Sequence, residues 1–284
     1  MNFYIGTANF LKKYGYKNNS VNKKEILKIF YFLKKKKIFR IDTAQRYDEF
    51  SKFSDKVKFK NSKISTKIFF KDSDFKKNNF EFFFINQIQK KINFLKIKKF
   101  ETIFVHNFDD IKSVNLLKLF NLMRKLKKLK LTKMIGLSIY DPKSILRTKL
   151  KSKCDIIQAP VNIFNKKFLR NDVFKILKKN KIKLQARSIF LQGLLVDKKF
   201  MFKNNKKYKI INEFNLWCSN NKINAYEYCI NFILNQKNVD SFVVGIENLK
   251  QLKILYNFVF LEKNKKVVKK VFFNKDYFID TRKI

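Results

Sequence analysis

The stretch Phe39-Arg-Ile-Asp-Thr-Ala-Gln-Arg-Tyr-Asp-Glu-Phe50 joins a short apolar strand to a polar loop. The predicted strand ends at the carboxylate of Asp42, and Tyr47 follows five positions later. A carboxylate at the end of a strand with a phenol in the next loop is a plausible start for proton-transfer chemistry. By itself the pattern is also typical of a strand that ends at a capping acid. The residues at the ends of the neighbouring strands decide between the two interpretations.

Short apolar strands alternate with helical segments on both sides of this stretch. The predicted strands are 3–6, 39–42, 63–67, 102–105, 134–138, 155–158, 183–188 and 241–245. The predicted helices are 23–35, 80–95, 114–129, one opened by Pro142, 171–179, 211–219, 225–235 and 249–258. Near-continuous apolar strands are typical of a parallel sheet covered on both faces. Eight such strands alternating with helices predict an α/β fold, the (β/α)8 TIM barrel.

The chain has 284 residues, enough for one large domain or two small ones. No linker rich in Pro, Gly or Ser divides it, so we expect a single domain over residues 1–284. An open, doubly wound sheet is the alternative fold. It is less favoured because no glycine-rich phosphate-binding loop follows an early strand.

The net charge of +44 raises the question of a nucleic-acid or membrane-surface partner. Only seven of the 66 basic residues are arginine, the residue that reads phosphates and bases with a bidentate fork. The lysines are also spread along the whole chain instead of forming one arm or tail. We therefore expect no specific nucleic-acid partner.

Cysteine usage and hydropathy indicate the compartment. Cys154, Cys218 and Cys229 show no CxxC spacing, and the chain has one histidine, so we expect reduced thiols and no structural metal. No apolar run approaches the roughly 18 residues of a membrane span, and no secretion signal opens the sequence. These features predict a cytoplasmic protein without a membrane segment.

Ionisable side chains stand at the ends of three consecutive predicted strands. Asp42 ends the second strand and its loop carries Tyr47, Lys67 ends the third, and His106 directly follows the fourth. In a barrel, the carboxyl ends of neighbouring strands lie about 4.8 Å apart around one mouth. Each residue alone has a commoner explanation, since lysines abound here and a lone histidine is usually structural. Their joint placement predicts a site.

Such a set suits proton donation to a carbonyl. A tyrosine with a pKa near 10 is a weak donor at neutral pH, and a neighbouring ammonium such as Lys67 stabilises its phenolate. Asp42 then serves as the counter-ion of Lys67. The imidazole of His106 can orient the carbonyl oxygen. Because no side chain donates hydride, reduction of the carbonyl implies a nicotinamide cofactor.

At these residues the chain resembles the aldo-keto reductase family over nearly its whole length. The run Ala186-Arg-Ser-Ile-Phe-Leu-Gln-Gly-Leu-Leu195 is similar to a bacterial subgroup of that family. The matching segments are Ile5-Gly-Thr-Ala8, Ile41-Asp-Thr-Ala44 with Tyr47, Ser65-Thr-Lys67, Val105-His106, Ile135-Gly-Leu-Ser138, Ile157-Gln158 with Asn162, and Val243-Val-Gly245.

The resemblance implies a barrel that reduces aldehydes or ketones by direct hydride transfer, with NADP(H) preferred and NAD(H) possible. It implies Tyr47 as the general acid, tuned by Lys67 and Asp42, with His106 orienting the carbonyl. A small-molecule carbonyl substrate and a monomer or weak homo-oligomer are also implied. The cofactor-binding positions carried over are Gly6, Thr7, Asp42, Ser138, Gln158, Arg187, Ser188, Gly245, Asn248 and Gln251.

Three positions depart from the family pattern. Ile139 stands where an asparagine often holds the carboxamide, and Arg187 where many members stack a tyrosine on the nicotinamide. Gln251 stands at the usual arginine position for the 2′-phosphate, and Lys250 or Lys253 could substitute for that arginine. These departures keep open a barrel retained as a binding or regulatory subunit. A basic nucleic-acid-binding protein is the third possibility.

The loop after Tyr47, the segment 190–209 and the C-terminal tail carry no motif that indicates a substrate.

Overall fold

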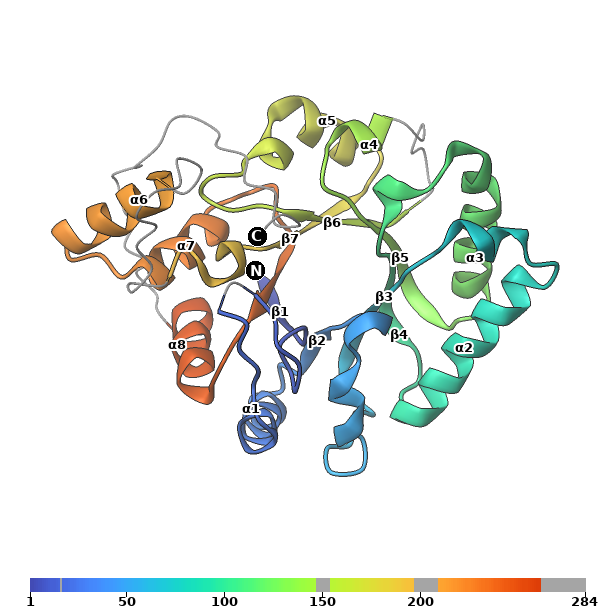
Figure 1. Cartoon of the computed structure of the whole chain (residues 1–284), viewed down its shortest axis with the longest axis horizontal. Coiled ribbons are helices and arrows are strands. Elements are labelled where there is room, and N and C mark those ends of the chain that lie inside the picture. Colours follow the sequence, from blue (N-terminus) through green and yellow to red (C-terminus); the bar gives the residue numbers. More distant parts are fainter. Residues whose placement is uncertain (16, 147–153, 197–208, 262–284) are drawn as a thin grey trace.

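Eight parallel strands close into one barrel in the order β1 to β8, with β8 paired to β1 (Figure 1). The computed structural model describes residues 1–15, 17–146, 154–196 and 209–261. The strands are β1 (Asn2–Gly6), β2 (Arg40–Asp42), β3 (Lys63–Ile68), β4 (Phe100–Val105), β5 (Thr132–Ser138), β6 (Ile156–Pro160), β7 (Lys183–Arg187) and β8 (Ser241–Gly245). The predicted single-domain (β/α)8 barrel is confirmed, and closure between β1 and β8 excludes the open sheet.

Helices lie outside the ring of strands, as Figure 1 shows. They are α1 (Lys23–Lys35), α2 (Phe80–Leu95), α3 (Leu116–Lys128), α4 (Lys143–Leu146), α5 (Asn171–Lys179), α6 (Lys209–Asn220), α7 (Ala225–Leu234) and α8 (Leu249–Phe260). The predicted order of elements is confirmed, including two helices between β7 and β8. Part of the predicted loop 190–209 and the C-terminal tail lie outside the described residues.

Many predicted boundaries differ from the observed ones by one or two residues, and two of these differences have identifiable reasons. The predicted stop of the sixth strand before Pro160 is wrong, because β6 includes this residue as its last member. A proline is tolerated at the end of a strand, where its missing N–H breaks no interior ladder. The helix predicted from residue 114 begins at Leu116, after a tight 3₁₀ turn over Ser113–Asn115.

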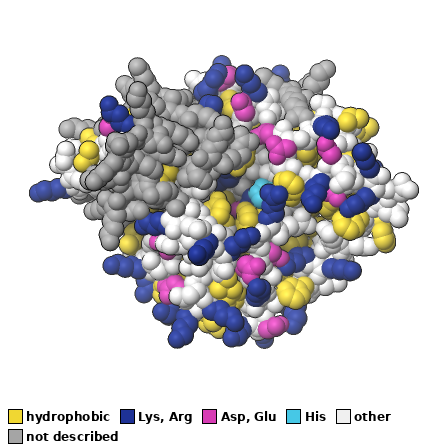
Figure 2. All heavy atoms as spheres, viewed as in Figure 1, with side chains coloured by type: hydrophobic (Ala, Val, Ile, Leu, Met, Phe, Trp, Pro, Cys, Tyr) yellow, Lys and Arg dark blue, Asp and Glu magenta, His cyan; other side chains and the backbone are white. Residues whose placement is uncertain are grey.

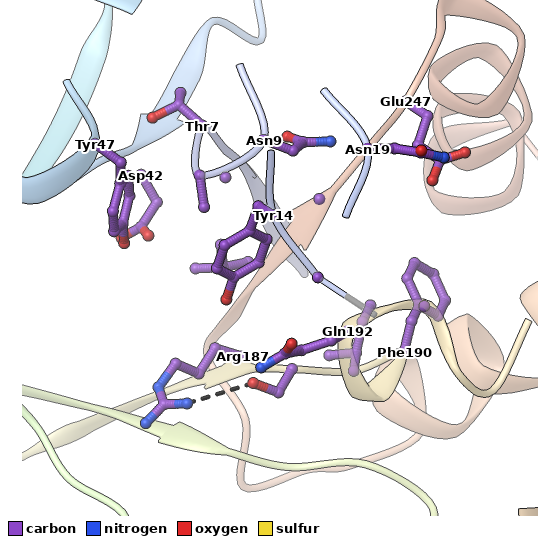
Figure 3. A pocket seen from close by; sticks show the side chains of 18 of the residues that line it. Thr7, Asn9, Tyr14, Asn19, Asp42, Tyr47, Arg187, Phe190, Gln192 and Glu247 are labelled. Atoms are coloured by element: carbon purple, nitrogen blue, oxygen red, sulfur yellow. Dashed lines mark hydrogen bonds between the residues drawn. The ribbon is translucent and has the colours of Figure 1, made fainter. Parts of the chain in front are cut away.

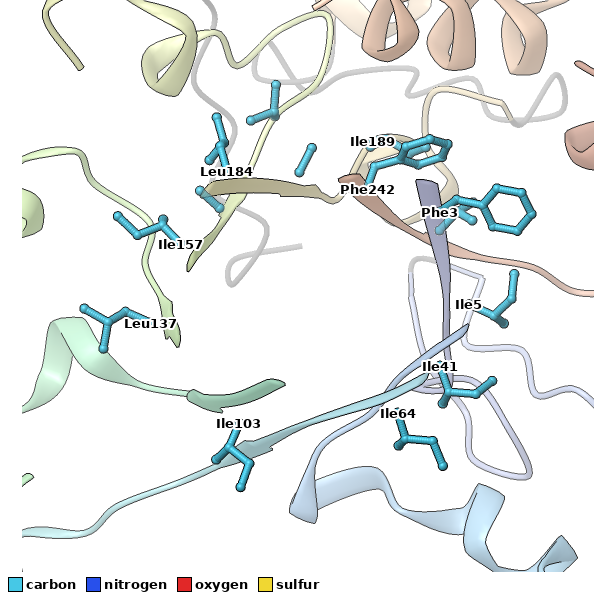
Figure 4. Packing of buried hydrophobic residues seen from close by; sticks show 14 of the residues in the cluster. Phe3, Ile5, Ile41, Ile64, Ile103, Leu137, Ile157, Leu184, Ile189 and Phe242 are labelled. Atoms are coloured by element: carbon cyan, nitrogen blue, oxygen red, sulfur yellow. The ribbon is translucent and has the colours of Figure 1, made fainter. Parts of the chain in front are cut away.

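The outward faces of the strands form the main core. Ile5, Ile41 and Ile64 are completely buried, and Figure 4 shows them radiating away from the barrel axis with their counterparts on other strands. Helices supply the opposing surface; α1, for example, begins at an Asn22 side chain that accepts from the Glu25 N–H and buries Phe30 on its inner face. Each such apolar side chain contributes about 1.5–3 kcal/mol by leaving water.

Many inward positions are polar, so the expectation of near-continuous apolar strands is wrong at those positions. Because side chains alternate along a strand, the polar residues Asp42, Lys67, Gln158 and Gln185 fall on the face opposite the isoleucines, and all four are buried. They form a hydrogen-bonded row: the Gln158 amide nitrogen donates to Asp42 Oδ1 at 2.9 Å and to Gln185 Oε1 at 2.7 Å. The Gln185 amide nitrogen donates to the Ser241 hydroxyl at 3.1 Å. These residues therefore form a hydrogen-bonded polar layer inside the barrel, directly below the cavity at the carboxyl ends of the strands.

Two other expectations bear on the fold. The three cysteines are buried and free of disulfides, as predicted. Within the described ranges, no helix combines the length and the apolar character needed to cross a membrane.

Candidate active site

A cavity of about 470 Å³ opens at the carboxyl ends of the strands, and all four candidate catalytic residues line it. Asp42 and Lys67 come from the ends of β2 and β3, Tyr47 from the loop after β2, and His106 from the residue after β4. Figure 3 shows Tyr47 and Asp42 at one side of this cavity and Glu247 at another. The barrel thus brings together the residues that the strand ends predict.

A buried ion pair anchors the group. The Lys67 ammonium donates to a carboxylate oxygen of Asp42, to the Tyr47 hydroxyl at 3.2 Å and to the Thr43 carbonyl at 3.2 Å. The second oxygen of Asp42 accepts from Gln158. A buried charge is tolerated only when paired and hydrogen-bonded, and both members of this pair are.

The Tyr47 ring is held by its own short loop. A 3₁₀ turn over Gln45–Tyr47 follows β2 almost at once, and the Tyr47 N–H donates to the Ala44 carbonyl at 3.0 Å. The Thr43 hydroxyl donates to the Tyr47 carbonyl at 3.3 Å, and the buried Thr7 hydroxyl donates to Thr43 at 2.9 Å. This compact turn returns the phenol to the end of β3, where Lys67 lies.

His106 completes the group from the far side of Lys67. Its backbone N–H donates to the Ile68 carbonyl at 2.8 Å, and its ring lies 6.0 Å from the Tyr47 ring at 82°. Burial, then Lys67 and the nearby arginines, lower the pKa of His106 from 6.5 to about 3. The imidazole is therefore neutral at pH 7 and carries one N–H. Its Nδ1 is buried without a hydrogen-bond partner among the described residues.

Burial dominates the protonation of the phenol. Desolvation, followed by the Asp42 carboxylate, raises the pKa of Tyr47 well above 10, and Arg187 acts in the opposite direction. This net direction is opposite to the acidification expected from Lys67, because desolvation is the largest cause. Burial also lowers the pKa of Lys67, against the pull of Asp42.

Nearly all predicted cofactor positions line the same cavity: Gly6, Thr7, Asp42, Ser138, Gln158, Arg187, Ser188, Gly245 and Gln251. Asn248 does not line it, because its side chain caps α8 by accepting from the Gln251 N–H at 2.9 Å. The Gln251 side-chain oxygen accepts from the Glu247 N–H at 2.8 Å. Lys250 and Lys253 are exposed and do not line the cavity.

The polar atoms around the cavity fit a nicotinamide group. The Gln158 Oε1 atom is buried without a partner within the described part of the chain, and the Ser138 side chain lies beside the same space. An amide carbonyl and a hydroxyl are the acceptor and donor that a carboxamide needs. Ser188, the first residue after β7, has a left-handed backbone (φ 56°). Its carbonyl accepts from the Asn162 side-chain amide at 3.1 Å, and this hydrogen bond fixes the start of the loop after β7.

Sequence reasoning missed several lining residues because they lie in loops. Tyr14, from the loop after β1, projects into the cavity in Figure 3, and Tyr140 lines it from the loop after β5. Ile139, flagged as a missing carboxamide partner, is instead buried in the core. The carbonyl of Gln192 lies 3.1 Å from the position of a Cβ built on Gly15, so the two loops meet closely over the cavity. No sequence motif indicates this contact.

Comparisons with known proteins agree with the fold and show the family. The sequence model of the Aldo/keto reductase family matches residues 3–271. The structure resembles an aldo-keto reductase from Bacillus halodurans in its holo form (TM-score 0.70, 14% identity, covering 92% of this chain and 87% of that one). It also resembles a glycerol dehydrogenase from Gluconobacter oxydans (TM-score 0.66, 16% identity, 91% and 86% covered). A search of curated sequences finds no match.

The chain therefore belongs to the aldo-keto reductase family and is an NAD(P)H-dependent oxidoreductase of that type. At 14–16% identity the structural neighbours establish the fold alone.

Proposed function

We propose that the protein reduces an aldehyde or ketone to the alcohol, with Tyr47 as the general acid of an Asp42–Tyr47–Lys67–His106 tetrad. The observation that carries this proposal is the 3.2 Å contact between the Tyr47 hydroxyl and the Lys67 ammonium at the wall of an open cavity. General acid catalysis needs a proton donor that lies beside the space for the substrate, and here that donor also contacts a charged partner.

Each residue has a separate role in the proposed reaction. When bound, the reduced nicotinamide supplies a hydride, and thus two electrons, to the carbonyl carbon. The Tyr47 hydroxyl donates its proton to the carbonyl oxygen, which completes the alcohol. Lys67 stabilises the phenolate that remains, and Asp42 holds the ammonium in place. The neutral His106 donates its N–H to the carbonyl oxygen and orients it.

The remaining lining residues are proposed to hold the cofactor. Ser138 and Gln158 would bind the carboxamide, while Gly6, Thr7, Ser188, Gly245 and Gln251 provide the surrounding wall. A preference for NADP(H) over NAD(H) has weaker support. Glu247 contributes a carboxylate to the cavity wall, whereas Lys250 and Lys253 do not line it. Fluorescence titration with NADPH and NADH decides the point: tighter NADPH binding supports the preference, and tighter NADH binding contradicts it.

The direct test is turnover. The protein is mixed with NADPH or NADH and a panel of aldehydes and ketones, and loss of the absorbance of the reduced nicotinamide is followed. We expect cofactor oxidation that depends on both the carbonyl compound and the protein. Tight cofactor binding without turnover of any carbonyl would instead favour a barrel kept as a binding or regulatory subunit. That second candidate is motivated by Ile139 and Gln251, which replace expected cofactor partners.

Other aspects of the proposal concern the setting of the reaction. We propose a small-molecule carbonyl substrate, a monomer or weak homo-oligomer, and a cytoplasmic location. The buried, free thiols support a reducing compartment. Size-exclusion chromatography with light scattering tests the oligomeric state.

A further inference from the structure

Arg187 places a guanidinium at the cavity, and no carboxylate among the described residues forms an ion pair with it. It ends β7, lines the cavity, and donates from Nη1 to the Ser188 hydroxyl at 3.3 Å. Its guanidinium carbon lies 4.1 Å from the centroid of the Tyr140 ring, which holds the group flat. The Nη2 atom is buried and has no hydrogen-bond partner among the described residues. The side chain is thus positioned but only partly satisfied.

The carboxylates at this cavity do not neutralise Arg187. Asp42 is paired with Lys67 and Gln158, and Glu247 lies in another part of the cavity in Figure 3. Asp109, near the Tyr140 backbone, accepts from the Tyr140 N–H at 2.7 Å and from the Ser144 hydroxyl at 2.5 Å. In the described part of the chain, no ion pair includes Arg187.

An unpaired buried N–H of a cation is costly, because its hydration is lost and nothing replaces it. A ligand that brings a negative charge would satisfy it. Guanidinium groups bind carboxylates and phosphates through two parallel hydrogen bonds, and such charge-assisted contacts are about twice as strong as neutral ones. The free Nη2 therefore points to an anionic ligand.

The position of Arg187 relative to the tetrad indicates which ligand this is. Tyr47 follows β2 and His106 follows β4, whereas Arg187 comes from β7 on the opposite side of the closed ring. Figure 3 shows Arg187 across the cavity from Tyr47 and Asp42. Its charge also reaches the tetrad, since it helps to lower the pKa of His106 and of Lys67. A carbonyl held at Tyr47 and His106 thus has a cation across the same space.

We propose that the carbonyl substrate carries an anionic group, a carboxylate or a phosphate, which the Arg187 guanidinium binds while Tyr47 and His106 hold the carbonyl oxygen. This rests on the proposed reductase function and names its substrate class. The resemblance to the family placed Arg187 among the cofactor-binding residues, whereas this proposal assigns it to the substrate.

The test compares matched substrates. The measured quantity is the ratio of kcat/KM for succinic semialdehyde to kcat/KM for butanal, which has the same chain length and no carboxylate; glyceraldehyde 3-phosphate and glyceraldehyde form the phosphate pair. We expect the wild-type ratio to exceed about 10 for at least one pair and to fall about 10- to 100-fold in Arg187→Gln. Arg187→Lys keeps the positive charge but loses the two parallel N–H donors of the guanidinium, so its ratio should lie between those of the wild type and Arg187→Gln. Arg124→Gln, on the exposed face of α3, removes the same charge and should keep the wild-type ratio.

Other results would overturn the proposal. A wild-type ratio near 1 for both pairs would show that no anion is recognised. Equal losses for charged and neutral aldehydes in Arg187→Gln, with weaker NADPH binding by fluorescence, would assign the guanidinium to a cofactor phosphate.

The proposal can also be tested if no carbonyl is turned over, so that its failure is separable from that of the reductase function. Succinate, as a non-reactive anion, should raise the melting temperature of the wild type and of Arg124→Gln but not that of Arg187→Gln. Equal stabilisation of all three proteins, or of none, would contradict a role of Arg187 in anion binding.

Discussion

At the scale of single residues, burial has the largest effect on the protonation of Tyr47 and His106 at the cavity. Desolvation is the largest cause that keeps the proton on Tyr47 and off His106, and the Asp42 carboxylate adds to the first effect while the Lys67 ammonium adds to the second. A phenol with a raised pKa holds its proton at neutral pH, and in the proposed reaction it gives that proton only to a strong base such as an alkoxide. A neutral imidazole in turn remains a hydrogen-bond donor to the carbonyl throughout the physiological range.

The depressed pKa of His106 predicts a pH dependence of stability. The unfolded chain binds this proton near pH 6.5, but the folded protein binds it only near pH 3. Acid therefore favours unfolding between these values, and stability rises with pH from about 3 to about 6.5. Because the ring is partly exposed, we expect His106 to contribute at most about 1 kcal/mol per pH unit to this slope.

Urea unfolding of the wild type and His106→Gln between pH 4.5 and pH 7 measures the contribution. The variant should lose less stability on acidification than the wild type. Parallel pH profiles of the two proteins would contradict a lowered pKa of His106 in the folded state.

At the scale of elements, every strand ends in a residue or loop that contributes to the cavity, while the strand bodies keep the barrel closed. Gly136, inside β5, shows how tightly the interior is filled. A Cβ at this position would lie 2.5 Å from the Phe104 ring and 2.9 Å from Ile156. The Phe104 ring therefore occupies the space that a side chain at position 136 would need, on the neighbouring strand β4.

Substitution at this glycine should destabilise the barrel. Gly136→Ala forces Phe104 or its strand to move, and overpacking of this kind costs about 1–3 kcal/mol. Gly245→Ala at the end of β8 is the matched control, because its added Cβ would have no heavy atom within 4 Å. Urea denaturation of both variants provides the comparison. If Gly136→Ala were as stable as Gly245→Ala, the interior would be looser than the structure indicates.

The predictability of these elements has a physical basis. Asp42, Lys67 and His106 could be found from the sequence because a closed parallel barrel brings consecutive strand ends to one mouth. Tyr14 and Tyr140 could not be found, since loop conformations depend on contacts distant in sequence, such as Gly15 against Gln192. The pairing of Gln158 with Asp42 was also missed.

At the scale of the whole molecule, the charge is spread and not focused. Figure 2 shows Lys and Arg side chains distributed around the face that it presents, with acidic residues among them. Several of the acids pair with exposed lysines, as Asp155 does with Lys127 at 2.6 Å. Exposed pairs of this kind contribute little to stability, so most of the +44 charge acts as a diffuse field.

Such a field predicts weak, salt-sensitive binding to nucleic acid. We expect a fluorescent DNA duplex to bind at about 20 mM salt and to dissociate at about 150 mM, where the Debye length falls to roughly 8 Å. Fluorescence anisotropy across a salt series measures this. Sub-micromolar binding that persists at about 150 mM salt would revive the basic nucleic-acid-binding alternative.

The most direct test of the account is a comparison of Tyr47→Phe with the wild type, in which the loss of one oxygen atom removes the proposed proton donor. Turnover of a reactive aldehyde with NADPH and the NADPH dissociation constant are measured on both proteins. We predict that the variant loses at least about 100-fold in kcat, the usual scale for a general acid, while cofactor affinity changes little. Carbonyl reduction at the wild-type rate by Tyr47→Phe would contradict the central claim.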